Sequence, residues 1–212
     1  MMHAQASAWI TLFLLGAYHG INPAMGWLFA VALGLQKQND RAVWQALLPI
    51  AAGHVLAIGA VLTVAAIAGA VLPLHVIRIG VVVLLVAFGL FRIVSRKHPR
   101  FGGMQVGFRD LTIWSFLMAC AHGAGLMLLP VLLGMSGASE HHEMHAMAFP
   151  GLGTQVLAVA VHTLGYLLFT GAAAWIVYKR LGLSVLRKAW LNLDFVWATA
   201  VIATAGLMLL LP

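Results

Sequence analysis

Long apolar runs constrain this chain more than any other feature of its sequence. A membrane-spanning helix needs about 20 mostly apolar residues, and we count six such runs, at residues 8–35, 46–71, 76–94, 111–135, 151–178 and 191–211. Apolar side chains make up 63% of the chain and charged ones only 8%, whereas soluble domains are about 25% charged. We therefore expect an all-α integral membrane protein with six transmembrane helices.

Basic residues between the runs predict which side of the membrane each connection faces. Lys37 and Arg41 lie between the first and second runs. Two further groups surround the third-to-fourth and fifth-to-sixth connections: Arg92, Arg96, Lys97, Arg100 and Arg109, and then Lys179, Arg180, Arg187 and Lys188. Because short cytoplasmic loops carry an excess of Lys and Arg, we expect these three connections in the cytoplasm and both termini on the outer side.

This charge distribution also excludes some partners. A net charge of +7 would suggest nucleic acid in a soluble protein, but here it sets orientation, so no nucleic-acid partner is expected. We expect a multi-pass protein that lies in the lipid bilayer of a bacterial-type cytoplasmic (inner) membrane. The single Cys120 excludes an intramolecular disulfide and a dithiol redox pair. A homodimer is compatible with these features.

Two halves of the chain resemble each other in their histidines. His19-Gly20 in the first run matches His122-Gly123 in the fourth, and His54 in the second matches His162 in the fifth. Each half holds three runs, an odd number, so the second half enters the membrane from the opposite side, as in the inverted repeats of transporters. We expect a first repeat at residues 1–94, a basic cytoplasmic connection at 95–110, and a second repeat at 111–212 with an outer loop at 136–150.

The four paired histidines are the candidate core of a site. Each lies about nine to eleven residues into its run, which at about 1.5 Å per residue puts it near the bilayer centre. Imidazole nitrogens need partners in hydrocarbon, so we expect a midplane metal site of two to four imidazoles, formed by His19, His54, His122 and His162. The alternative is that each ring is satisfied by a neighbouring carbonyl. Both one shared site and two separate pairs fit the sequence.

Other residues of the runs are candidates for supporting roles. Gly20, Asn22, Pro23 and Gly26 should interrupt the helix and expose carbonyl groups. Met25 and Met127 could add soft ligands, or fill the core instead. We also expect Asn22, Thr163 and Tyr166 to support the ligating side chains without binding the ion themselves. Asp194 is the candidate proton-coupling carboxylate, for which a helix cap is the alternative.

The outer loop is rich in metal-binding side chains. Within a short window it holds Glu140, Glu143 and five candidate ligands: His141, His142, Met144, His145 and Met147. His with Met favours copper, and His with carboxylate also admits nickel, cobalt or zinc. We expect this loop to capture a metal ion, the alternative being a solvated tract. Hydrolase motifs are not apparent, so a transporter is favoured over an enzyme.

The chain has six predicted spans in two halves, a His in a broken Gly/Asn/Pro motif, its partner in the fourth span and a His-rich loop. Together these features resemble the LysE-type transporter superfamily. The chain is most similar to its NicO-like (nickel/cobalt efflux) and urease-accessory-like small membrane proteins. The resemblance implies proton-driven export of a divalent transition metal. Those nickel families carry a His-plus-Asp motif in the first span, whereas His19-Gly20-Ile21-Asn22-Pro23 has no acid, which leaves copper or an organic solute open.

Three functions follow as hypotheses. The first is a transporter of a transition-metal cation of the copper, nickel, cobalt or zinc class. The second is a membrane redox protein that binds haem b through pairs of imidazoles. The third is a LysE-type exporter of a small organic solute, with a structural histidine cluster and no bound metal.

Overall fold

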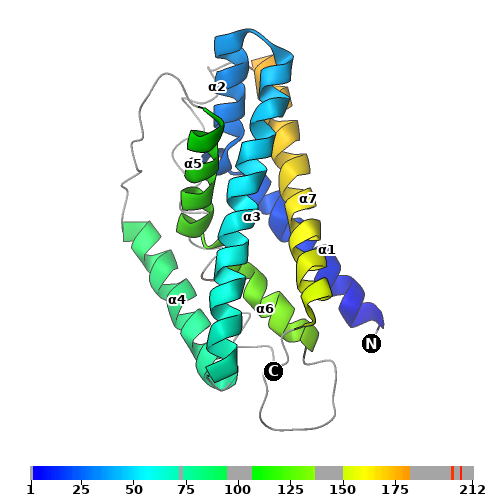
Figure 1. The fold of residues 1–212 in the computed structure, drawn as a ribbon, viewed down its shortest axis with the longest axis vertical. Helices are drawn as coiled ribbons and strands as arrows, with labels where there is room; N and C mark the ends of the chain where they lie inside the picture. The colour runs from blue at the N-terminus through cyan, green and yellow to red at the C-terminus, as the bar shows by residue number, and fades with distance from the viewer. Residues whose placement is uncertain are drawn as a thin grey trace.

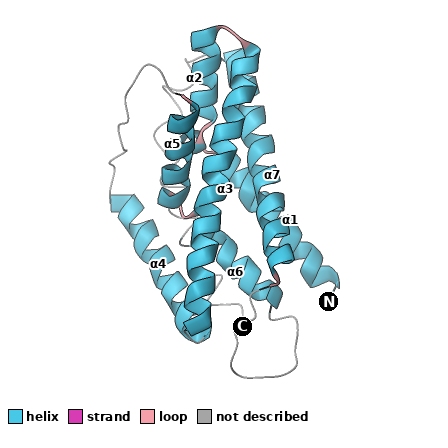
Figure 2. Cartoon of the chain, viewed as in Figure 1, coloured by secondary structure: helices cyan, strands magenta, loops and turns pink. Residues whose placement is uncertain are grey.

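The described part of the chain is built from helices and short turns. The computed structural model describes residues 2–71, 74–94, 107–136 and 150–181, with residues 202 and 206 beyond them. Within these residues there is no strand, which confirms the all-α prediction (Figure 2). In chain order the elements are α1 (Met2–Ile21), η1 (Pro23–Met25), α2 (Trp27–Lys37), α3 (Asp40–Val71), α4 (Leu74–Val94), α5 (Phe108–Ala121), α6 (Ala124–Ser136), α7 (Leu152–Ile176) and the π-helical turn η2 (Val177–Leu181).

Two described helices are long and apolar enough to cross a membrane without interruption. These are Asp40–Ala68 in α3 and Leu152–Arg180, which covers most of α7 and η2. A third candidate exists if α5 and α6, which are bent by 57° at their junction, count as one span. The predicted run at 191–211 lies almost entirely outside the described residues, so the six-span topology stays a prediction.

The outward faces of these helices are apolar. Leu14 of α1 is 58% exposed, Leu48 and Val64 of α3 are each 68% exposed, and Leu164 of α7 is 54% exposed. Single exposed apolar residues are common in soluble proteins, but apolar faces that recur along several helices indicate contact with an apolar partner. This pattern is what helices surrounded by lipid require.

The first predicted interruption lies between α1 and α2. Asn22 is extended (φ −67°, ψ 121°), as expected before a proline, and its Oδ1 accepts a hydrogen bond from the amide of Ala24 at 3.0 Å. Gly26 has φ +128°, which side chains rarely adopt. Trp27 Nε1 donates across the break to the carbonyl oxygen of Ile21 at 2.9 Å. The break is therefore a defined turn held by hydrogen bonds.

The second interruption lies between α5 and α6. His122 follows the last residue of α5 as its cap, with φ −105° and ψ 3°, and Gly123 comes next with φ +67°, in the left-handed region that favours glycine. Figure 1 shows α1 and α2 together running along the bundle in one direction and α5 and α6 running in the other, with α3 and α7 beside them. Both interruptions therefore lie inside the bundle and not at its ends.

Glycines let α1 and α7 pack closely. A Cβ atom on Gly16 would lie 1.9 Å from the carbonyl oxygen of His162, and one on Gly165 would lie 2.3 Å from that of Phe13. The same device joins α3 to α5, since a Cβ on Gly53 would lie 2.2 Å from the carbonyl oxygen of Thr112. Small residues at such crossings allow backbones to approach, so the helices that carry the histidines are held close together.

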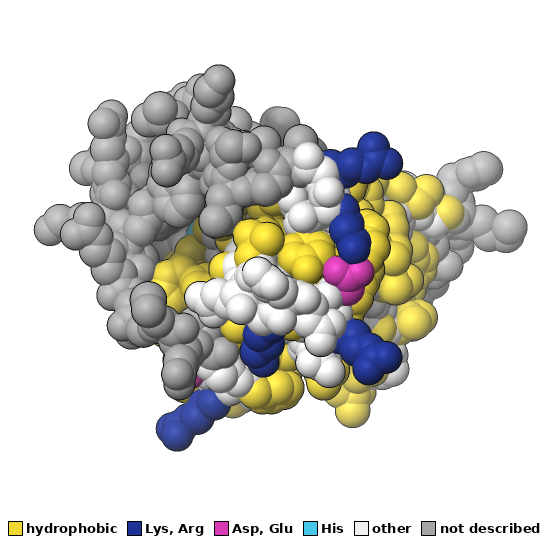
Figure 3. Space-filling view, turned by 90° about the horizontal axis from the view of Figure 1, so that it is seen from above, with side chains coloured by type: hydrophobic (Ala, Val, Ile, Leu, Met, Phe, Trp, Pro, Cys, Tyr) yellow, Lys and Arg dark blue, Asp and Glu magenta, His cyan; other side chains and the backbone are white. Residues whose placement is uncertain are grey.

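Charged side chains gather where α2 ends and α3 begins. Figure 3 shows this end of the molecule, with several Lys and Arg side chains around one acidic group. Lys179 Nζ lies 2.6 Å from Asp40 Oδ2 and 5.0 Å from the centre of the Trp175 ring. The start of α3 and the turn η2 that follows α7 are therefore joined by an ion pair, and the Lys179 ammonium lies over an aromatic ring of α7.

Candidate functional site

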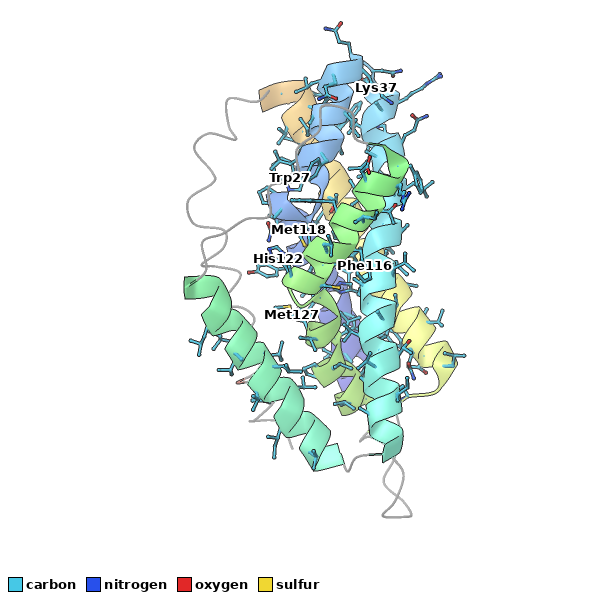
Figure 4. All side chains as sticks on the ribbon, turned by 60° about the vertical axis from the view of Figure 1, so that its left-hand side comes forward. Trp27, Lys37, Phe116, Met118, His122 and Met127 are labelled. Carbon is cyan, nitrogen blue, oxygen red and sulfur yellow. The ribbon has the colours of Figure 1, made fainter. Side chains whose placement is uncertain are left out.

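The four predicted core histidines are all fully buried. His19 lies near the end of α1, His54 within α3, His122 at the α5–α6 junction and His162 within α7, and each has 0% relative exposure. Figure 4 shows His122 at that junction, between Met118 of α5 and Met127 of α6. Each interrupted segment and each long helix therefore contributes one imidazole to the interior.

Three of these rings form a compact triangle. The ring centres of His19 and His162 are 5.2 Å apart, those of His54 and His162 5.4 Å, and those of His19 and His54 5.7 Å. His122 lies close enough to His19 for the two imidazoles to interact electrostatically. Of the two arrangements that the sequence left open, one cluster therefore describes the structure better than two separate pairs.

His19 and His122 have matching hydrogen bonds. In each, Nδ1 lies 2.8 Å from the carbonyl oxygen four residues earlier, that of Leu15 for His19 and that of Met118 for His122. A carbonyl oxygen can only accept, so Nδ1 carries the proton, and in the neutral ring the lone pair is on Nε2. In metal sites, a hydrogen bond of this kind from the other ring nitrogen orients a ligating histidine.

His54 and His162 face each other across the interior. Their rings are nearly parallel, at 7°, with the two Nε2 atoms 3.3 Å apart. His162 Nδ1 lies 3.2 Å from the carbonyl oxygen of Leu12 and donates to it. His54 Nδ1 is buried and has no hydrogen-bond partner among the described residues.

The three residues predicted to support the ligating side chains have different surroundings. The Tyr166 ring stacks on His54 with ring centres 4.0 Å apart, and its hydroxyl donates to the carbonyl oxygen of Met25 at 2.5 Å. Asn22 caps the turn between α1 and α2. Thr163 Oγ1 is buried without a hydrogen-bond partner in the described part of the chain. Tyr166 therefore contacts the imidazole of a cluster histidine, whereas Asn22 contacts His19 through the backbone, its amide donating to the His19 carbonyl oxygen at 3.2 Å.

Of the remaining predicted residues, the two methionines are buried and the others lie outside the described part of the chain. Met25 is 1% exposed and Met127 0%, and the hydrogen bonds described for Met25 are made by its backbone, with the carbonyl oxygen accepting from Tyr166 and the amide donating to the Asn22 carbonyl oxygen at 3.0 Å. The loop residues and the acid of the last run lie outside the described residues: His141, His142, Met144, His145, Met147 and Asp194. The roles predicted for them stay predictions.

Ser115 is a buried polar residue near the cluster that the sequence did not single out. Its Oγ donates to the carbonyl oxygen of Ile50 at 2.6 Å, and its side chain is buried. Ser115 precedes His122 by seven residues, two helical turns, which places the two residues on one face of α5. This spacing was the sequence signal that could have pointed to Ser115. Its hydrogen-bond acceptor, the Ile50 carbonyl oxygen, is 65 residues away, and no local sequence pattern points to that contact.

The cluster offers a close pair of nitrogen ligands. Among the described residues, no group of three or more His, Cys, Asp or Glu side chains is arranged so that it could hold a metal ion. The 3.3 Å between His54 Nε2 and His162 Nε2 nevertheless equals the separation of about 3.3 Å between two ligands on a tetrahedral ion with bonds of about 2.0 Å. A third imidazole would have to rotate to complete such a site.

Haem fits this arrangement poorly. Two imidazole nitrogens on opposite faces of one haem iron are about 4 Å apart, at about 2 Å per bond, which is wider than the 3.3 Å between the facing Nε2 atoms of His54 and His162. The glycine after His19 leaves no space for a porphyrin, because a Cβ on Gly20 would lie 2.4 Å from the carbonyl oxygen of Tyr166. The space that glycine opens is filled by α7.

The chain was compared with protein families, with curated proteins and with solved structures. No family model matches it, and no curated protein or solved structure matches it either. Its function therefore has to be inferred from the histidine cluster itself.

Proposed function

We propose that this protein is an inner-membrane transporter of a transition-metal cation of the copper, nickel, cobalt or zinc class. The observation that carries the proposal is the triangle of His19, His54 and His162, whose ring centres lie 5.2 to 5.7 Å apart in a fully buried site. Imidazole is a preferred ligand of these ions and, being neutral, tolerates burial. Carboxylates or ammonium groups in the same place would cost far more free energy.

The two helix interruptions support a site that an ion can enter and leave. Irregular backbone at membrane depth is tolerated where it lines a cavity, and transporter sites form at such interruptions. Here one interruption begins three residues after His19 and the other includes His122. Proton and metal compete for the same imidazole lone pair, so protonation would provide a release step and a coupling ion.

We further propose that the protein has six spans in two inverted repeats. The packing of α1 on α7 and of α5 on α3 supports this arrangement, because the two pairs exchange when the first half is laid on the second. So do the matching Nδ1 bonds of His19 and His122 at 2.8 Å. Transport would then arise from rocking one repeat against the other, with the outer loop at 136–150 handling the ion outside.

A metal measurement and a flux measurement test the proposal. Protein purified in detergent without chelator or an affinity-tag metal should contain a transition metal, measured by inductively coupled plasma mass spectrometry, and the His19→Ala/His122→Ala double variant should lose it. Each single variant should lose transition-metal flux in proteoliposomes, because each removes an imidazole from the cluster. Cys120→Ala is the matched control, since Cys120 lies two residues from His122 but is exposed.

The possible results separate the three hypotheses. Wild-type flux in both single variants would overturn the midplane site. Stoichiometric iron that is lost in the double variant would favour haem. No metal in either protein would turn the search to an organic solute.

A further inference from the structure

The two long apolar helices reach the same end of the bundle. Asp40–Ala68 begins there and Leu152–Arg180 ends there, and Asp40 Oδ2 lies 2.6 Å from Lys179 Nζ. Each helix has 29 residues, or about 43 Å at about 1.5 Å per residue. That length is close to the roughly 40–45 Å thickness of a bilayer together with its headgroup regions. In helices that cross the bilayer, this shared end lies at the level of the lipid headgroups.

Three aromatic side chains pack together just inside this end. The ring centres of Trp44 and Trp175 are 5.4 Å apart, and those of Trp175 and Tyr178 are 6.5 Å apart. Trp44 reaches from α3 to α7, because a Cβ on Gly171 would lie 3.3 Å from its ring. Trp44 is four residues from Asp40, about 6 Å along the helix. This depth is that of the membrane interface, where Trp and Tyr side chains are enriched.

Basic side chains outnumber acidic ones around the ion pair. Arg41 and Arg180 are exposed and lie next in sequence to its two members, and Figure 3 shows Lys and Arg side chains around the acidic group. The carboxylate of Asp40 is engaged by Lys179 and also interacts with Tyr178. The Arg41 and Arg180 guanidinium groups have no ion-pair partner in the described part of the chain. Two positive groups are therefore open to an anion.

An apolar stripe leads from this end toward the middle of α3. Trp44, Leu48 and Val55 are 49%, 68% and 38% exposed. At about 100° per residue, the three lie within about 40° of one another around the helix axis, and Arg41 lies about 60° from Trp44. One face of α3 therefore carries a guanidinium group at the headgroup level and exposed apolar side chains at greater depth. A phospholipid has the same order of charge and hydrocarbon.

We propose that an anionic membrane phospholipid binds here, with its phosphate at the Arg41 and Arg180 guanidinium groups and an acyl chain along Trp44 and Leu48. Guanidinium groups bind phosphate oxygens in pairs, and basic side chains at the ends of membrane helices attract anionic headgroups. A free anion would gain nothing from the apolar stripe. The inference goes beyond the proposed transport, because it requires the bilayer but not a metal ion.

Native mass spectrometry of the detergent-purified protein tests the headgroup preference. Phosphatidylglycerol and phosphatidylcholine with identical acyl chains are titrated separately, so that only the headgroup differs. Wild type should bind phosphatidylglycerol roughly 30-fold more tightly, from about fivefold for each of the two guanidinium groups. Equal affinities would overturn the proposal, in a comparison that needs no variant to fold.

Single substitutions then locate the site. Arg41→Gln and Arg180→Gln should each lower the affinity for phosphatidylglycerol about fivefold and leave that for phosphatidylcholine unchanged. Arg109→Gln is the matched control, because Arg109 is also an exposed arginine but lies on α5, and it should bind both lipids as wild type does. An equal fall in Arg109→Gln would indicate a response to total charge and would overturn a defined site.

Two further measurements separate this proposal from other accounts. Glycerol 3-phosphate carries a phosphate but no acyl chain, so at the concentration of the lipid it should not displace phosphatidylglycerol, and displacement would overturn a lipid as the occupant. The metal content of the same samples distinguishes this site from the proposed function. A preference for phosphatidylglycerol in protein without bound metal would support the lipid site and count against the metal site. Bound metal without a lipid preference would do the reverse.

Discussion

Gly16, at the crossing of α1 and α7, sets how closely His19 and His162 approach each other. α1 and α7 cross at Gly16, where an added Cβ would lie 1.9 Å from the carbonyl oxygen of His162, a backbone atom that cannot rotate away. The carbonyl oxygen of Leu12, one turn earlier in α1, accepts the hydrogen bond from His162 Nδ1. Helix separation and histidine orientation are therefore set by the same contact.

Gly16→Ala should separate α1 from α7 and loosen the histidine cluster. Overpacking of this kind costs about 1–3 kcal/mol, so the midpoint of thermal unfolding in detergent should fall. Gly59→Ala is the matched control: a Cβ there meets nothing within 4 Å, and the higher helix propensity of alanine should leave the midpoint unchanged or raise it. Equal behaviour of the two variants would show that the crossing is not tight.

The cluster could be predicted from the sequence, but not its hydrogen bonds. Depth in an apolar run and pairing between halves singled out His19 and His122, and both are buried. The stacking of Tyr166 on His54 and the bond from Ser115 to Ile50 depend on which faces of distant helices meet. Apolar helices with few charges give little periodic signal about those faces.

At the scale of elements, the helix ends were harder to predict than the helices. Apolarity alone placed the start of the second run at residue 46, whereas α3 begins at Asp40. The reason is local: Asn39 Oδ1 accepts from the amide of Arg41 at 2.9 Å, so a polar first turn can precede the apolar stretch. The interruption after α1, by contrast, was visible in advance from Asn22-Pro23 and Gly26.

The contact between the start of α3 and η2 should depend more on Lys179 than on Asp40. Their ion pair is exposed, with side-chain exposures of 42% and 46%, so its own contribution is small. Lys179 also lies 5.0 Å from the Trp175 ring and 5.6 Å from that of Tyr178, which adds cation–π attraction. Lys179→Ala should therefore lower the midpoint of thermal unfolding more than Asp40→Asn does.

Salt distinguishes the two contributions at this contact. At 1 M salt, where the screening length is about 3 Å, the effect of Asp40→Asn should disappear while part of the Lys179→Ala effect remains. Arg180→Ala is the control for removing a neighbouring positive charge. Equal effects of Lys179→Ala and Asp40→Asn at both salt concentrations would contradict a role for the aromatic rings.

At the scale of the whole molecule, the proposed orientation can be tested from two exposed positions. Gln38, between α2 and α3, and Gly151, just before α7, are both exposed, and Figure 1 shows the end of α2 and the start of α7 at opposite ends of the bundle. The basic residues Lys37 and Arg41 beside Gln38 predict that its end is cytoplasmic. Since three proposed spans separate the two positions, they should lie on opposite sides of the membrane.

Cysteine labelling in a Cys120→Ala background would decide this orientation. A membrane-impermeant maleimide should label Gln38→Cys only in inside-out vesicles and Gly151→Cys only in right-side-out ones, because the reagent reaches one face in each preparation. Labelling of both from one face would mean an even number of crossings between them and would rule out inverted three-span halves. Labelling of each from the face opposite to that expected would keep the repeat but reverse its orientation, so that the His/Met-rich loop would meet metal ions inside the cell.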